Sequence, residues 1–243
     1  MIDTTLDPAT ATDAATEPLP TEGAEEEVMT LHYSPTPQQP PHRAPRPVRY
    51  RRGQTVYHEG DPAMSLYRVE SGLVRVAKLT PRGRVLTVRH VLPGDYFGEE
   101  ALTRRSRNHQ VEALTDATIT SVDPGSVTAE SMHVITRSLS DQLHRVMDYE
   151  YHLQTGDLRQ RVARYLLQLS ETPIGGRDEA GRAYVRATHE LIAEGTSSTR
   201  ESVSKIVTDL RLEGLIETGY RRILLARPDA LREIADSVPD EDF

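Results

Sequence analysis

The sequence predicts an α+β fold made of a roll of short strands, one long helix, and a pair of helices followed by a strand hairpin. Three observations lead to this class. Short apolar stretches alternate with glycine-containing turns over residues 48–125. Apolar residues recur every three or four positions over 126–155, and two short helical patterns precede two strand-like stretches near residue 220. At 243 residues the chain allows one large domain or two modest ones.

Strand-length stretches fill the segment from 48 to 125. They are rich in branched apolar residues, and turns at residues such as Gly60, Gly72, Gly83 and Gly94 separate them. The expected strands are 55–57, 66–69, 73–77, 85–92, 111–114 and 117–122. Several short strands at this spacing are typical of an all-β barrel or roll.

Residues 126–155 are predicted to form a long helix. Its seam steps by four and three and includes two polar members, and it consists of Met132, Thr136, Leu139, Leu143, Val146, Glu150 and Leu153. Such a seam is found in a helix that pairs with a second copy, and equally in an amphipathic helix that packs against the roll. The pattern alone leaves both interpretations open.

Two short helices separated by a polar break are expected after residue 188. The break is 195–198, and Thr199 stands where the second helix needs an N-cap. That helix has an apolar face made of Val203, Ile206, Val207 and Leu210. A helix whose first turn is polar and charged, tied to a short preceding helix, fits the DNA major groove. The alternative is an ordinary helical hairpin with a solvated face.

The segments around this pair have patterns of their own. We expect a helix over 157–169 and a Pro/Gly-rich loop over 172–181. Two short strands, 216–218 and 221–225, flank a tight turn at Gly219 and Tyr220, as in a winged helix. Pro228 is placed to open a short terminal helix.

Both ends of the chain are acidic. Residues 1–47 contain eight acids against Arg43 and Arg46, a net of −6 within a total of −8, and prolines crowd their second half. We expect a disordered tail, with a partner-binding arm as the alternative. Residues 236–243 form a second acidic tail. Segregated acidic tails are compatible with a locally positive surface elsewhere on the chain.

Composition excludes several classes of protein. The chain has no cysteine, so disulfides, thiolate metal sites and cysteine-held iron–sulfur clusters are excluded. No apolar run reaches the ~20 residues of a membrane helix, and the acidic N-terminus is no signal peptide. We therefore expect a soluble cytoplasmic protein without a membrane partner. The sequence contains no Walker, His-Glu-x-x-His or Gly-x-Ser-x-Gly motif, and its histidines are scattered, so we expect neither an enzyme nor a metal site.

The C-terminal motifs carry a family resemblance. Residues 198–205, Ser-Thr-Arg-Glu-Ser-Val-Ser-Lys, and 210–216, Leu-Arg-Leu-Glu-Gly-Leu-Ile, resemble the recognition half of the cyclic-AMP receptor protein (CRP/FNR) family of transcription regulators. Residues 92–99, Leu-Pro-Gly-Asp-Tyr-Phe-Gly-Glu, followed by Arg107, resemble the family's cyclic-nucleotide-binding β-roll. The resemblance covers about residues 48–230, and the order of the parts matches throughout.

The resemblance implies three parts and a homodimer. These are a β-roll sensor domain at 48–125, a long dimerisation helix at 126–155 and a winged helix-turn-helix DNA-binding domain at 156–235. A dimer seam is favoured for the long helix because DNA readers of this type bind paired half-sites through two-fold symmetry. The family also implies a palindromic site with half-sites like TGTGA.

The DNA-binding residues follow from the same resemblance. Arg200, Glu201 and Lys205 are expected to read bases, and Ser204 belongs to the same set. The base-reading types agree with the donor and acceptor pattern of the major groove. Hydroxyl-bearing residues are expected either to contact phosphates or simply to cap helices and turns, and they are Thr188, Ser197, Ser198 and Thr199.

The resemblance also places a ligand pocket in the roll. Gly98 allows close backbone approach, Glu99 suits a ribose hydroxyl, and Arg107 is the expected phosphate clamp. Asn108 stands where cyclic-AMP binders usually carry a small hydroxyl residue. Val146 and Met147 align with long-helix positions that usually offer polar contacts to adenine.

Several forms of control therefore remain open. Cyclic AMP, another small ligand, and DNA binding without a ligand are all compatible with the sequence. A haem-based gas sensor on the same fold and an enzyme with a nucleotide-binding regulatory domain are remoter alternatives. The loop at 172–181 resembles the region that family activators present to RNA polymerase, or it is a plain connector. Activation and repression both stay open.

Overall fold

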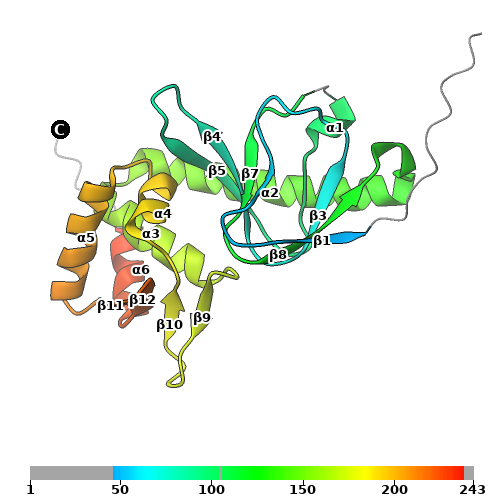
Figure 1. Cartoon of the computed structure of the whole chain (residues 1–243). Coiled ribbons are helices and arrows are strands. Elements are labelled where there is room, and N and C mark those ends of the chain that lie inside the picture. The colour runs from blue at the N-terminus through cyan, green and yellow to red at the C-terminus, as the bar shows by residue number, and fades with distance from the viewer. Residues whose placement is uncertain (1–45, 104–105, 238–243) are drawn as a thin grey trace, which may run out of the picture. The chain divides into compact units, whose positions relative to one another are not determined.

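The computed structural model describes residues 46–103 and 106–237. Its first eight strands form two four-stranded sheets, β1-β8-β3-β6 and β2-β7-β4-β5, with antiparallel neighbours (Figure 1). The elements are β1 Pro47–Tyr50, β2 Thr55–Tyr57, β3 Leu66–Ser71, β4 Val74–Leu79, β5 Val85–Val91, β6 Tyr96–Phe97, α1 Glu100–Thr103, β7 Gln110–Ala113 and β8 Ala117–Val122. The two sheets share one core that includes Val69, Val76, Val111 and Ile119, which confirms the predicted roll.

The two predicted tails lie largely outside the described residues. β1 begins at Pro47, the last residue of the expected N-terminal tail, and residues 1–45 are not described. At the other end, Asp236 is the last residue of a helix and residues 238–243 are not described. The two interpretations of the N-terminal tail therefore stay predictions.

A long helix, α2 (Ala129–Thr155), follows the roll after a short 3-10 turn, η1 (Pro124–Ser126). Thr128 caps it by accepting a hydrogen bond from the Ser131 amide. Ile135 and Gln142 are buried against the rest of the protein, and Gln142 Nε2 donates to the Tyr96 carbonyl oxygen at 2.8 Å. The helix therefore packs partly on the roll, which is one of the two interpretations that the sequence left open.

The second half of the seam predicted for α2 faces the chain's own helix α3. Val146 and Leu153 are half-buried and line cavities against α3, whereas Met147 and Tyr151 are 61% and 63% exposed. The exposed apolar side chains after Leu143 are Met147 and Tyr151, spaced by four residues.

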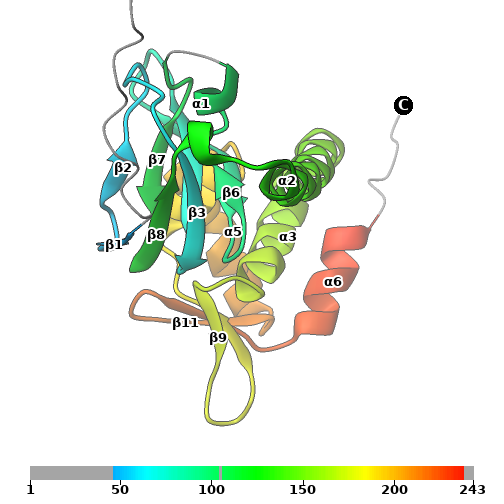
Figure 2. The ribbon, with the colours of Figure 1, turned by 90° about the vertical axis from the view of Figure 1, so that its right-hand side faces the viewer.

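The C-terminal part contains four helices and a third four-stranded sheet. The elements are α3 Leu158–Ser170, β9 Gly175–Arg177, β10 Ala183–Val185, α4 His189–Gly195, α5 Arg200–Leu212, β11 Ile216–Gly219, β12 Arg222–Leu225 and α6 Pro228–Asp236. The sheet has the order β11-β12-β10-β9. Figure 2 shows α6 beside α3, and Leu231 of α6 is fully buried in the core that this part shares.

The helices and strands predicted for this part are confirmed, except in the segment 172–181. Asp157 and Gln160 form a capping box that starts α3, and Pro228 occupies the first turn of α6. The segment 172–181, expected to be a loop, instead begins a hairpin in which β9 pairs with β10. A three-residue strand that starts with two glycines carries no strand pattern, so the sequence prediction was wrong there.

No helix within the described ranges is long and apolar enough to cross a membrane.

Candidate nucleic-acid interface and sensor pocket

Helices α4 and α5 form a helix-turn-helix whose ends are capped by threonines. Thr188 Oγ1 accepts from the Leu191 amide, and Thr199 Oγ1 accepts from the Ser202 amide, each at 3.2 Å. The turn between the helices contains Ser197 in the left-handed region, at φ +52°. The hydroxyl groups of Thr188 and Thr199 therefore serve as helix caps, which is one of the two roles that the sequence left open.

The outer face of α5 brings the predicted base-reading residues together. Arg200, Glu201 and Lys205 are exposed and line an open groove of about 420 Å³. We call this set the recognition face, and it consists of Arg200, Glu201, Ser204, Lys205, Thr208 and Asp209. Among the described residues, Arg200, Glu201 and Lys205 form no ion pair, so their charged ends are available to a partner.

The inner face of α5 fixes the direction of this outer face. Val203, Val207 and Leu210 are at most 2% exposed and lie in the core shared by the C-terminal part. These residues recur at the spacing predicted from the sequence, so the recognition face must point away from the core. The turn before α5 also forms a hydrogen bond with the roll, in which Arg84 Nη2 donates to the Ser198 carbonyl oxygen at 2.9 Å.

The expected phosphate clamp of the roll is buried among groups of the chain itself. Arg107 is 3% exposed, and it donates to the carbonyl oxygens of Gly98 at 2.9 Å and Ser65 at 2.6 Å. Its guanidinium carbon lies 4.3 Å from the centre of the Tyr57 ring, a cation–π contact. A Cβ on Gly98 would lie 2.9 Å from Arg107 Nη1, so glycine permits this close packing. Both terminal nitrogens of the guanidinium are therefore already engaged by the chain, whereas Nε has no hydrogen-bond partner among the described residues.

Glu99 and the backbone of Asn108 are engaged as well. Both carboxylate oxygens of Glu99 accept from Arg89 Nη2 at 2.8 Å. The backbone amide of Asn108 donates to Glu100 Oε1 at 3.3 Å, and its backbone carbonyl oxygen accepts from Lys78 Nζ at 3.0 Å. Burial disfavours the charged form of Glu100, but hydrogen bonds from His109 and backbone amides outweigh it and lower its pKa to about 2.

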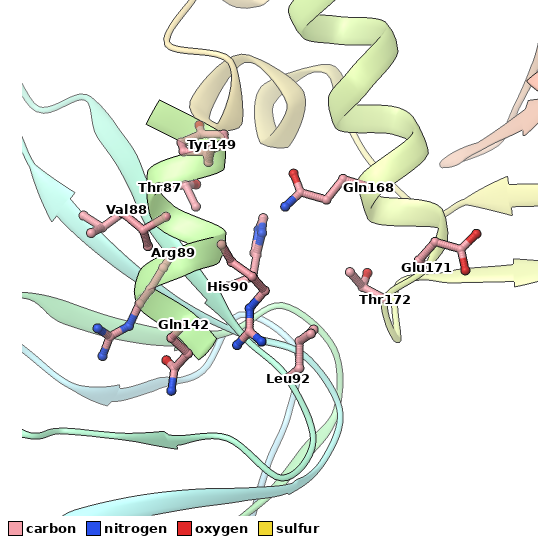
Figure 3. Close-up of a pocket in the computed structure, with 12 residues that line it drawn as sticks. Thr87, Val88, Arg89, His90, Leu92, Gln142, Tyr149, Gln168, Glu171 and Thr172 are labelled. Carbon is pink, nitrogen blue, oxygen red and sulfur yellow. The ribbon is translucent and has the colours of Figure 1, made fainter. Parts of the chain in front are cut away.

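A cavity of about 170 Å³ lies between β5, α2 and α3 (Figure 3). Val146 lines it together with Val88 and Tyr149. Val146 is one of the two residues aligned with the family's adenine contacts, and the other, Met147, is exposed. At the position of Val146 this cavity has an apolar side chain, which packs and forms no side-chain hydrogen bond.

Polar contacts between the roll and the helix-turn-helix were missed by sequence reasoning. Arg75 on β4 forms ion pairs with Glu112 at 3.1 Å and with Glu194 on α4. Tyr149 on α2 donates to the carbonyl oxygen of Gly195, the last residue of α4. The only signal in the sequence was an arginine inside the apolar run 73–77.

A second missed contact joins His90 on β5 to Tyr165 on α3. His90 Nε2 lies 3.2 Å from the Tyr165 hydroxyl oxygen, and the two rings stack with their centres 5.8 Å apart. Burial, and then the positive charge of Arg75, lower the pKa of His90 to about 4. The imidazole is therefore neutral in the folded protein at pH 7.

This shift predicts how stability depends on pH. Unfolded chains protonate histidine near pH 6.5, so the unfolded state binds more protons than the folded state between about pH 6.5 and 4. The His90 contribution is complete above this window and is lost as the pH falls through it, for a total of about 3 kcal/mol. Urea denaturation at pH 7 and pH 4.5 should show that the free energy of unfolding falls more between these two pH values in the wild type than in His90→Gln. An equal fall in both proteins would contradict the prediction.

Among the residues that the structure describes, no group of three or more histidines or carboxylates is placed to hold a metal ion.

Comparisons with known proteins divide the chain in the same way, into the roll and the helix-turn-helix part. Residues 47–130 match the cyclic nucleotide-binding domain family, and residues 160–234 match the Crp-like helix-turn-helix domain family. The transcriptional regulator LdrP of Thermus thermophilus is 52% identical over 189 residues, which cover 78% of this chain and 96% of LdrP. The CRP-like cAMP-activated global transcriptional regulator of Mycobacterium tuberculosis is 29% identical over 197 residues, covering 76% of this chain and 86% of that protein.

A solved structure shows the same fold. The crystal structure of a CRP-family transcriptional regulator from Thermus thermophilus matches with a TM-score of 0.76 and 51% identity. The match covers 79% of this chain and 97% of that chain.

The fold and these matches define a transcription regulator that joins a nucleotide-binding type of roll to a DNA-binding module. The chain belongs to the CRP/FNR family. Its relatives are named as transcriptional regulators and not as enzymes.

Proposed function

We propose that this regulator binds DNA as a homodimer and reads a palindrome with TGTGA-type half-sites. The observation that carries the proposal is the position of Arg200, Glu201 and Lys205 together on the recognition face. Arginine donates two bonds to guanine O6 and N7, glutamate accepts from the cytosine amino group, and lysine reaches a further guanine. Because lysine is a point donor rather than a fork, we expect weaker discrimination at its base.

Hydroxyl groups near the start of each helix support a role in positioning the two helices on DNA. Thr188 and Thr199 cap the two helices, and Ser197 and Ser198 form the turn between them. Hydroxyl groups and backbone amides at such places contact phosphate oxygens and fix the register without reading sequence. The total charge of the chain is −8, so these contacts and a few cations must supply the affinity for DNA.

The exposed apolar stripe of α2 supports the homodimer. Met132, Leu143, Met147 and Tyr151 are 38%, 58%, 61% and 63% exposed along one helix. Apolar surface of this kind is stabilised when a second copy covers it. A two-fold dimer through α2 would present two copies of α5 to half-sites whose centres lie about one helical turn apart.

We further infer that DNA binding does not require cyclic AMP. A nucleotide in the roll would have to displace Arg107 from two carbonyl oxygens and from the Tyr57 ring. It would also have to compete with Arg89 for the Glu99 carboxylate. The Mycobacterium tuberculosis relative is named as cAMP-activated, so activation by the nucleotide is the alternative that the experiment must separate.

Fluorescence anisotropy of a labelled TGTGA palindrome, at fixed salt and with and without cyclic AMP, tests both proposals. We expect saturable binding whose Kd changes by less than about twofold when the nucleotide is added. A duplex with both half-sites scrambled is the control for non-specific binding. Binding that tightens by more than about tenfold with cyclic AMP would show a working sensor and overturn the ligand-independent proposal.

Replacing Arg200 by alanine should weaken binding to the palindrome and relax specificity at one guanine. Loss of a bidentate guanine contact costs about 1–3 kcal/mol, or roughly 5- to 150-fold in Kd. Arg232→Ala is the matched control because it removes the same charge from an exposed ion pair on α6. The measurement is competition with single-base variants of each half-site. An equal loss on every sequence would assign Arg200 to the phosphate backbone instead.

The hairpin β9–β10 supports RNA polymerase as a further partner. Its segment resembles the region that family activators present to the polymerase, and Arg177, Glu179 and Arg182 are exposed along it. We therefore propose an activator that works in the cytoplasm, where DNA and polymerase are found.

A further inference from the structure

A cavity of about 310 Å³ lies between the C-terminal half of α2, α3 and the end of α4. Basic side chains line it from two helices, with Arg145 and His152 on α2 and Arg161 and Arg164 on α3. None of Gly98, Glu99 and Arg107, the predicted pocket residues of the roll, lines this cavity. It is therefore separate from the phosphate end of that pocket.

The cations of this cavity exceed its anions. Arg145 pairs with Asp95 at 2.5 Å, but within the described residues neither Arg161 nor Arg164 forms an ion pair. Asp148, also in the lining, and Asp236 on α6 lie nearby and take part in no ion pair of the described residues. Two guanidinium groups thus face the cavity without a direct ion pair among the described residues, and Asp148 and Asp236 balance their charge only from a distance.

Each of these arginines uses only part of its hydrogen-bonding capacity. Arg161 Nη1 donates to the Leu153 carbonyl oxygen at 3.2 Å, and Arg164 Nη2 donates to the Ala235 carbonyl oxygen. Both carbonyls lie in the last turns of helices, so these bonds also cap α2 and α6. Nε of both arginines, Nη1 of Arg164 and Nδ1 of His152 are buried and have no hydrogen-bond partner.

Buried cationic donors without a counter-charge are unfavourable. A buried polar group that lacks a partner costs free energy, and a buried charge costs more unless it is paired. Burial lowers the pKa of Arg164, and burial together with the charge of Arg164 lowers the pKa of His152. An oxyanion bound in the cavity would supply the missing acceptors and a direct ion pair, and the guanidinium fork matches its geometry.

The remaining lining sets the size and the body of such a ligand. Tyr149, Leu153 and Leu167 contribute rings and aliphatic surface. The volume is roughly twice that of an apolar cavity of about 150 Å³ that accepts benzene. We propose that this cavity binds a small organic oxyanion with an apolar body of about two rings, and that Arg161 and Arg164 hold the anionic group.

A matched pair of probes tests the proposal on the wild-type chain without DNA. Isothermal titration with 2-naphthoate should give saturable binding, and 2-naphthamide, which has the same rings and no charge, should bind at least about tenfold more weakly. Inorganic phosphate, which lacks the rings, should also bind more weakly than 2-naphthoate. Equal binding of the acid and the amide, or no saturable binding of the acid, would overturn the proposal.

Three variants locate the site on α3. Arg161→Gln and Arg164→Gln should each raise the Kd of 2-naphthoate by at least about tenfold, because each removes one guanidinium from the cavity. Arg159→Gln is the control, since it removes the same charge from the same helix but at a residue outside this lining. Thermal melting identifies any variant that fails to fold, and the probe pair on the wild type needs no variant. An equal loss in Arg159→Gln would indicate general charge attraction and contradict the assigned site.

Discussion

Replacing Arg75 by methionine should lower the free energy of unfolding by about 3 kcal/mol. Arg75 is 6% exposed and pairs with Glu112 on β7 and Glu194 on α4. Its loss leaves two partly buried carboxylates without their cation, and removing one partner of a buried ion pair costs about 3–5 kcal/mol. We expect the low end because the side chains of Glu194 and Glu112 retain 18% and 24% exposure and therefore some hydration.

Urea denaturation at pH 7 measures this effect, and a second arginine provides the control. Arg68→Met removes the same charge from an exposed ion pair with Glu70 on β3, a strand of the other sheet of the roll, where about 1 kcal/mol or less is expected. A double-mutant cycle with Glu194→Gln separates the ion pair from other effects of the substitution. If Arg75→Met and Arg68→Met lose the same stability, the Arg75 cluster does not hold the roll to α4.

Local patterns were enough to predict most of the fold. Strands such as 117–122 and the apolar face of α5 follow from periodicity, because each element buries a face that its own residues define. The cap at Thr199 follows from short-range chemistry within one turn. The recognition face was predictable for the same reason, since its residues lie on the side of α5 opposite to the buried residues.

Contacts between distant residues could not be predicted in this way. Arg75 meets Glu194 across 119 positions, and nothing near either residue indicates the other. Arg107 was expected to be a free clamp because its type and position fit the role. Whether its guanidinium is free depends on Ser65 and Tyr57, which periodicity does not place beside it. The pattern of α2 likewise did not show that Val146 and Leu153 face α3, because such a seam fits contact with a second copy and with the chain itself equally.

Gly195 is the position where one added methyl group should have a large effect on both stability and DNA binding. A Cβ at Gly195 would overlap Cζ of Tyr165, far inside any normal contact distance. Tyr165 is 2% exposed and its ring stacks on His90, so it has little room to move. The end of α4 is held on its other side, because the Gly195 carbonyl oxygen accepts from Tyr149.

We therefore expect Gly195→Ala to lower the free energy of unfolding by about 1–3 kcal/mol, the usual range for overpacking a core. In a chain of this size that corresponds to a fall in Tm of roughly 2–12 °C. Gly125→Ala is the control, because a Cβ there would meet its nearest atom at an ordinary 3.5 Å. Since any relief of the clash must shift α4 relative to α3, and α5 follows α4 after a short turn, anisotropy should also show weaker binding to the palindrome. Normal stability with normal DNA affinity would mean that the close packing of Gly195 on Tyr165 does not position the recognition face.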